Sequence, residues 1–159
     1  MSGKTLTFVL VSAAAVALTG GIGMALASGG EISHPTTIHA VTKINAFGDA
    51  TARPGDPSHV ANSYALSGSL WNVSQTRRIG RIDVACTVTT TSGDRALCDA
   101  TFTLAGRGEI SASGVSLTNG APDTDPITGG DGQFRNVRGQ VEVGDSNSPT
   151  ISITLELEP

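Results

Sequence analysis

The sequence predicts an all-β fold built from short antiparallel strands, arranged as a sandwich or as a barrel. Its clearest signal is the alternation in Thr150–Glu158, where apolar side chains occupy every second position and share one face. A second signal is a series of similar β-rich segments separated by turn residues. No segment shows the helical period of an amphipathic helix, and together these features favour a sandwich or a barrel.

The expected strands are separated by segments rich in Gly, Pro, Asn, Asp and Ser. Residues 49–58 (DATARPGDPS) contain two prolines, and residues 118–126 (TNGAPDTDP) consist of turn residues throughout, so both are predicted to be loops. Asp123 and Asp125 are therefore expected to be turn residues. We expect strands at Thr37–Ile44, Asn62–Trp71, Arg78–Thr90, Arg95–Leu104, Glu109–Leu117, Phe134–Val143 and Thr150–Glu158.

The N-terminus has the pattern of a secretory signal peptide. Lys4 supplies a positive charge, Leu6–Leu18 is apolar apart from small hydroxyl residues, and Ala25-Leu26-Ala27 fits the small-x-small rule for cleavage. The alternative is a membrane anchor, but Thr19-Gly20-Gly21 interrupts the apolar run before it reaches the length of a spanning helix. We expect residues 1–27 to be removed, residues 28–36 to form a disordered lead, and residues 37–159 to form one secreted domain.

The two cysteines are predicted to form a disulfide. A hairpin with its turn at Thr91–Asp94, centred on Ser92, places Cys86 directly opposite Cys98. Opposed Cβ atoms of an antiparallel pair lie close to disulfide distance, and an exported protein favours the oxidised state. The alternative is a free catalytic or metal-binding thiol. It would need a histidine or carboxylate on the same face, and none is evident.

Three blocks resemble a known family. Residues 129–141 (GGDGQFRNVRGQV), the cysteine-bearing hairpin Ile82–Leu104 and the segment Gly106–Val115 are similar, in this order, to the bacterial allene oxide cyclase-like, or dirigent-like, barrel proteins. The resemblance implies a single eight-stranded antiparallel β-barrel. It further implies a small hydrophobic ligand in the lumen, with cofactor-independent cyclase, isomerase or stereo-directing activity as the alternative function. In this family an acidic residue precedes the leucine of the second strand. The corresponding segment of this chain, Ser67–Leu70, contains no acidic residue, so the resemblance assigns no catalytic residue here.

Strand parity indicates which side chains line such a barrel. If the apolar faces point inward, the charged side chains of Arg81, Asp83, Asp99, Glu109 and Glu142 point outward. The inward positions include many small residues, which leave room for one small ligand unless the barrel flattens. We expect the ligand-binding residues to be Tyr64, Leu66, Phe102 and Arg135.

Other function classes find little support. Basic residues cluster only at Arg77-Arg78 and nearby Arg81, which is too few for a nucleic-acid surface. His34, His39 and His59 lack the spacing of metal ligands, and no G-x-S-x-G motif is present. We therefore expect no metal, no cofactor, no nucleic-acid partner and no membrane contact after signal cleavage. The sequence leaves open the ligand, the oligomeric state and whether a reaction is catalysed.

Overall fold

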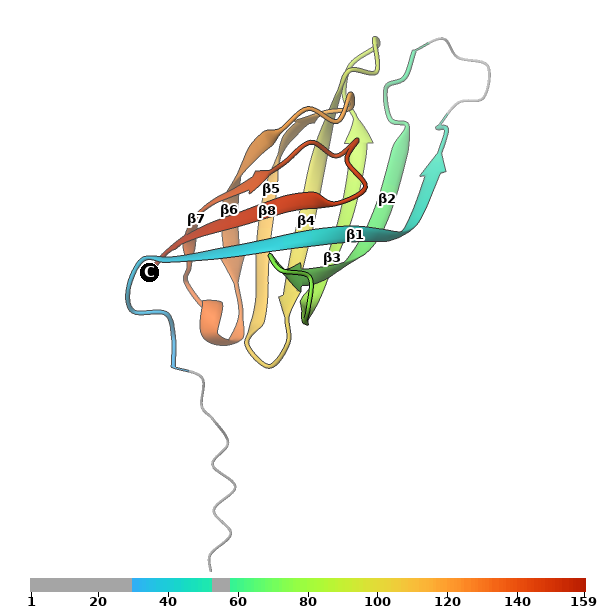
Figure 1. Cartoon of the computed structure of the whole chain (residues 1–159). Coiled ribbons are helices and arrows are strands. Elements are labelled where there is room, and N and C mark those ends of the chain that lie inside the picture. Colours follow the sequence, from blue (N-terminus) through green and yellow to red (C-terminus); the bar gives the residue numbers. More distant parts are fainter. Residues whose placement is uncertain (1–29, 53–57) are drawn as a thin grey trace, which may run out of the picture.

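The computed structural model describes residues 30–52 and 58–159, and the predicted signal peptide, residues 1–27, lies outside them. Its strands form one closed barrel in which each strand pairs antiparallel with its sequence neighbour and the last pairs with the first (Figure 1). The predicted eight-stranded antiparallel barrel is confirmed. The strands are β1 Thr36–Ala50, β2 Ser63–Asn72, β3 Arg78–Val88, β4 Arg95–Leu104, β5 Gly108–Leu117, β6 Asp123–Gly130, β7 Arg138–Val143 and β8 Ile151–Glu158.

One strand was not predicted. The sequence analysis assigned residues 118–126 to a loop, whereas β6 begins at Asp123 and places Asp125 and Ile127 on the inner face. A buried aspartate and a proline within the strand produce the composition of a turn, which explains the wrong prediction. Pro126 lies on the outer face opposite Gln140 of β7.

The boundaries of two other strands also differ from the prediction. Phe134 was expected to begin a strand, but it ends a short 3₁₀ helix, η1 (Gly132–Phe134), and β7 starts only at Arg138. The first strand continues to Ala50 because a bulge between Ile44 and Ala46 shifts its register against β2 without ending it. Residues 30–35 carry no regular secondary structure. Within them, Ile32 packs against the core and donates its backbone N–H to the carbonyl of Gln133 at 3.0 Å.

The barrel has two different ends. At the capped end, which contains η1 and the start of β1, the interior is fully packed: Phe134 is 0 % exposed and Phe102 is 1 % exposed. Cys86 and Cys98 lie toward the opposite end, here called the disulfide end, in a separate apolar cluster with Val88 and Ala96. Burying these apolar faces is the main driving force for closing the sheet.

The predicted disulfide is confirmed. Cys86 and Cys98 are direct partners in the β3–β4 ladder, and their Cα atoms lie 4.1 Å apart. Both cysteines are buried, so the bridge lies inside the barrel rather than on its surface.

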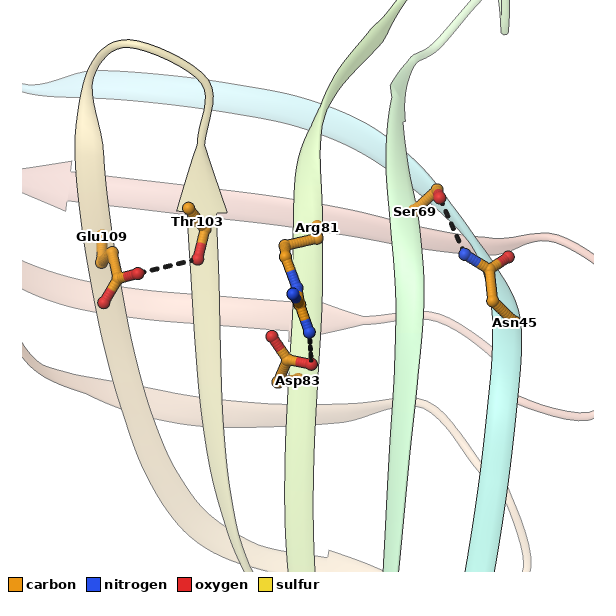
Figure 2. Close-up of polar contacts among 6 residues, drawn as sticks. All are labelled: Asn45, Ser69, Arg81, Asp83, Thr103 and Glu109. Atoms are coloured by element: carbon orange, nitrogen blue, oxygen red, sulfur yellow. Dashed lines mark hydrogen bonds and ion pairs between the residues drawn. The ribbon is translucent and has the colours of Figure 1, made fainter.

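The outer wall carries most of the strand charges, as parity predicted. Figure 2 shows Arg81 paired with Asp83 within β3, and the Thr103 hydroxyl donating to Glu109 across β4 and β5. In the same view, Asn45 donates to the Ser69 hydroxyl at 2.8 Å. Within residues 30–52 and 58–159, no helix is long and apolar enough to span a membrane.

Candidate functional site

A buried carboxyl group lies on the inner wall near the disulfide end. Asp125 of β6 is only 8 % exposed, although the sequence analysis expected it to be a turn residue. Its carboxyl group lies against Gly114 of β5, where a Cβ added to the glycine would stand 1.8 Å from Oδ1. The glycine therefore provides the space that the carboxyl group occupies.

The surroundings of Asp125 favour its neutral form. Burial raises the pKa of the Asp125 carboxyl, the negative charge of Asp123 raises it further, and a hydrogen bond with Ser116 acts in the opposite direction. Asp123 is two residues earlier on the same face of β6. Its Oδ1 accepts the backbone N–H of Thr124 at 2.8 Å, while its buried Oδ2 has no hydrogen-bond partner among the residues that the structure describes.

A phenol enters the same region from β2. The hydroxyl of Tyr64 contacts Sγ of Cys98 at 3.8 Å, and its ring stacks against Phe47 with the ring centroids 6.0 Å apart. Burial raises the pKa of Tyr64, so the phenol keeps its proton at neutral pH. Tyr64 is therefore available as a hydrogen-bond donor to a ligand.

Strand pairing places the phenol of Tyr64 and the carboxyl group of Asp125 on the same row of the inner wall. Tyr64 pairs with Cys86, Cys86 with Cys98, and Cys98 with Gly114, which lies beside the carboxyl group of Asp125. The phenol oxygen thus lies over β4 and the carboxyl group over β5. The two groups therefore contact neighbouring strands of the same inner wall.

Apolar side chains around these groups remain partly accessible to solvent. Leu66 and Val84 are paired across β2 and β3 and are partly buried, as is Ala100 beside Val84 on β4. Inner-face residues toward the capped end are buried almost completely, as Leu70 and Leu157 show. The inner face is therefore less completely buried around Leu66, Val84 and Ala100 than toward the capped end.

The structure brings together only part of the predicted ligand-binding set. Tyr64 and Leu66 both lie on the inner face of β2 near the disulfide end. Phe102 is part of the packed core, paired with Ile82 and Ile110. Arg135 is exposed and follows η1 at the capped end, so it does not begin a strand and does not accompany Tyr64.

Sequence reasoning missed Asp125, although a signal was present. Asp123, Asp125 and Ile127 occupy alternate positions, which is the period of a strand face that continues into an apolar residue. Among the residues that the structure describes, no three or more His, Cys, Asp or Glu side chains gather where a metal ion could bind.

Comparisons with known proteins confirm the fold. No family model and no curated protein sequence matches the chain. The solved structure of pyocyanin demethylase is similar, with 26% identity and a TM-score of 0.68, over 77% of this chain and 100% of that one. A pterocarpan synthase dirigent protein matches with 14% identity and a TM-score of 0.62, over 77% of this chain and 86% of that one. A Diels Alderase from Streptomyces koyangensis matches with 11% identity and a TM-score of 0.60, over 78% of this chain and 63% of that one.

Proposed function

We propose that this barrel binds a small, largely hydrophobic molecule through its disulfide end and anchors it to the carboxyl group of Asp125. The observation that carries the proposal is the desolvated carboxyl group on the inner wall, seated beside Gly114. Burying a carboxyl group costs stability, and groups with a pKa raised by desolvation concentrate at functional sites. Leu66 and Val84 supply an apolar wall for the remainder of the ligand.

The similar structures support a small organic ligand. They are named for the demethylation of pyocyanin, for pterocarpan synthesis and for Diels–Alder chemistry, and a further one is a heme-binding cyclase that catalyses a [4 + 2] cycloaddition. Barrels of this fold therefore accommodate varied organic ligands, and the side chains inside each barrel determine which one binds.

A second candidate function is cofactor-independent cyclisation or isomerisation, which the raised pKa of the buried Asp125 carboxyl group favours. A neutral carboxyl group can transfer its proton to a carbonyl oxygen of the ligand and so make the adjacent carbon electrophilic. After a bond forms at that carbon, the Asp125 carboxylate takes a proton back from the product, which restores the starting state. Tyr64 is positioned to stabilise the developing charge by donating a hydrogen bond.

We further propose that the protein acts outside the cytoplasm. The N-terminal pattern in residues 1–27 and the Cys86–Cys98 bridge support export, because disulfides persist in oxidising compartments. Intact-mass measurement of the exported protein tests this directly. A mature chain that begins at Ser28 supports the proposal, and a secreted or membrane-bound chain that retains Met1 contradicts the cleavage.

Native mass spectrometry against a panel of lipids, polyketides and phenolics tests the binding proposal. We expect at least one bound compound, and we expect Asp125→Asn to weaken its affinity roughly tenfold through loss of an acidic hydrogen bond. Asp83→Asn is the matched control, because it makes the same chemical change on the outer wall. A protein that remains empty against the whole panel contradicts the proposal.

The same panel separates binding from catalysis. If a bound compound is converted by the wild-type protein, Asp125→Asn is expected to abolish turnover while some binding remains. A bound compound that is recovered unchanged after long incubation favours a binding protein and contradicts the enzymatic alternative for that compound.

A further inference from the structure

The first strand carries an exposed phenylalanine beyond the point where its register against β2 shifts. Phe47 is 64% exposed, and it is the most exposed large apolar side chain within residues 30–52 and 58–159. Single apolar side chains on a surface are common, so exposure alone gives Phe47 no role. The direction of its side chain is more informative.

The β-bulge in β1 turns Phe47 toward the barrel interior. The register shifts between Ile44 and Ala46, so Asn45 is the extra residue of the bulge. Plain alternation from Ile44, which continues the inner face, would put Phe47 on the outer face. The extra residue reverses this parity, and Phe47 lies opposite Leu66 of the inner wall instead.

A side-chain hydrogen bond holds the bulge. Asn45 donates to the hydroxyl of the buried Ser69 at 2.8 Å, as Figure 2 shows. Beyond this point β1 bends and continues beside β2 (Figure 1). Bulges are frequent at the rims of barrels and beside functional sites, where they redirect a side chain. The bulge at Asn45 has this effect on Phe47.

Beyond the bulge, side chains of β1 and β2 share the inner face. Phe47 lies opposite Leu66, and Asp49 lies opposite Tyr64. The rings of Phe47 and Tyr64 stack with an interplanar angle of 26°, so both rings are on the same side of the sheet. Because Tyr64 and Leu66 belong to the proposed ligand site, Phe47 continues the apolar wall of that site toward solvent.

We propose that Phe47 contacts the bound ligand and covers its apolar part at the disulfide end. The inference rests on the proposed function and adds a residue of β1 to the site. One face of the Phe47 ring lies against Tyr64, which leaves ring surface exposed to water. Covering that surface with an apolar part of the ligand removes it from water and favours binding. Asp49 lies farther along the same face and ends the apolar wall with a carboxylate.

Titration with N-phenyl-1-naphthylamine tests this proposal. The fluorescence of this neutral, apolar compound rises when it leaves water, so it reports binding to the folded, disulfide-bonded protein. Phe47→Ala should weaken the binding roughly tenfold, because the apolar surface that covers the probe is lost. Val73→Ala is the matched control. It removes a similarly exposed apolar side chain in the β2–β3 turn, and it should leave the affinity unchanged.

An exchange of neighbouring residues tests the direction of the side chain. Ala46→Phe/Phe47→Ala keeps the composition of the strand but moves the phenyl ring to the position opposite Ser67, on the outer face. We expect this variant to bind the probe as weakly as Phe47→Ala does. Thermal unfolding of both variants checks that the barrel remains folded.

Wild-type affinity in Phe47→Ala or in the exchange variant would overturn the proposal. In that case the probe still binds, so the proposed function stands and only the role of Phe47 is wrong. A wild-type dimer that Phe47→Ala converts to a monomer, measured by light scattering, would also contradict it, because a second copy would then cover the ring. A wild-type protein that does not bind the probe contradicts the role of Phe47 too, while the panel of lipids, polyketides and phenolics decides the proposed function separately.

Discussion

Replacing Gly114 with alanine should displace the carboxyl group of Asp125 and destabilise the barrel. The new Cβ would lie 1.8 Å from Oδ1, 2.6 Å from Cγ and 3.2 Å from Cβ of Asp125. Such distances are far inside van der Waals contact, so either the aspartate leaves its position or β5 and β6 separate. Asp125 is 8 % exposed, which leaves little room for a different rotamer within the wall.

The expected cost follows from overpacking. Forcing added atoms into a well-packed interior typically costs about 1–3 kcal/mol, and about 1 kcal/mol lowers Tm by roughly 4 °C in a domain of this size. Gly48→Ala is the matched control, since no atom lies within 4 Å of its added Cβ and its φ is not in the left-handed region. A glycine replaced without strain stabilises by about 0.4–1 kcal/mol, so the two alanine variants should shift Tm in opposite directions.

Thermal and urea unfolding of the two single variants and of Gly114→Ala/Asp125→Ala provide the assay. Removing the carboxyl group removes the steric conflict, so the double variant should be more stable than Gly114→Ala alone, with a coupling of about 0.5–3 kcal/mol. If Gly114→Ala unfolds with the same Tm as Gly48→Ala, or if the second substitution restores nothing, the placement of Asp125 beside Gly114 is wrong.

Three further predictions concern stability. The folded-state pKa of Asp125 is raised, so its ionisation destabilises the fold as pH rises through that value. Asp125→Asn should therefore raise Tm at pH 7 and leave it unchanged at pH 3. An unchanged Tm at both pH values would contradict the desolvated carboxyl group. Cys86→Ala/Cys98→Ala should lower the free energy of unfolding by about 2–3 kcal/mol, because the bridge closes a short loop. Reaction of both cysteines of the wild-type protein with a thiol probe before reduction would show that no bridge exists. Phe134→Ala should cost about 3–5 kcal/mol. Phe47→Ala, 64% exposed in the native protein, should cost only the about 0.5–1.5 kcal/mol of its stacking against Tyr64. Equal costs in urea unfolding would refute the assigned core.

Strands with a regular apolar face could be predicted from the sequence because their pattern is local. Arg95–Leu104 has the predicted bounds, and the last strand differs by one residue. The disulfide was predictable for the same reason, since a hairpin register depends on its turn and on the residues that flank it.

The candidate site was less predictable because its residues depend on distant partners. Asp125 became a buried carboxyl group only because Gly114, eleven positions earlier, leaves space across the β5–β6 boundary. Arg135 was expected to belong to the ligand-binding set with Tyr64, but it follows η1 and is exposed at the capped end. Parity counting fails at such irregular segments, since an added residue moves every later side chain to the other face.

The sequence by itself determined the all-β class, the hairpin with its cysteine bridge and the division of most strands into an apolar and a polar face, because each of these depends on neighbouring residues. The tertiary structure alone decided which end of the barrel is filled and which strand carries the inward carboxyl group. Those properties depend on closure and register, which bring residues from separate strands into contact and set how much water reaches each of them.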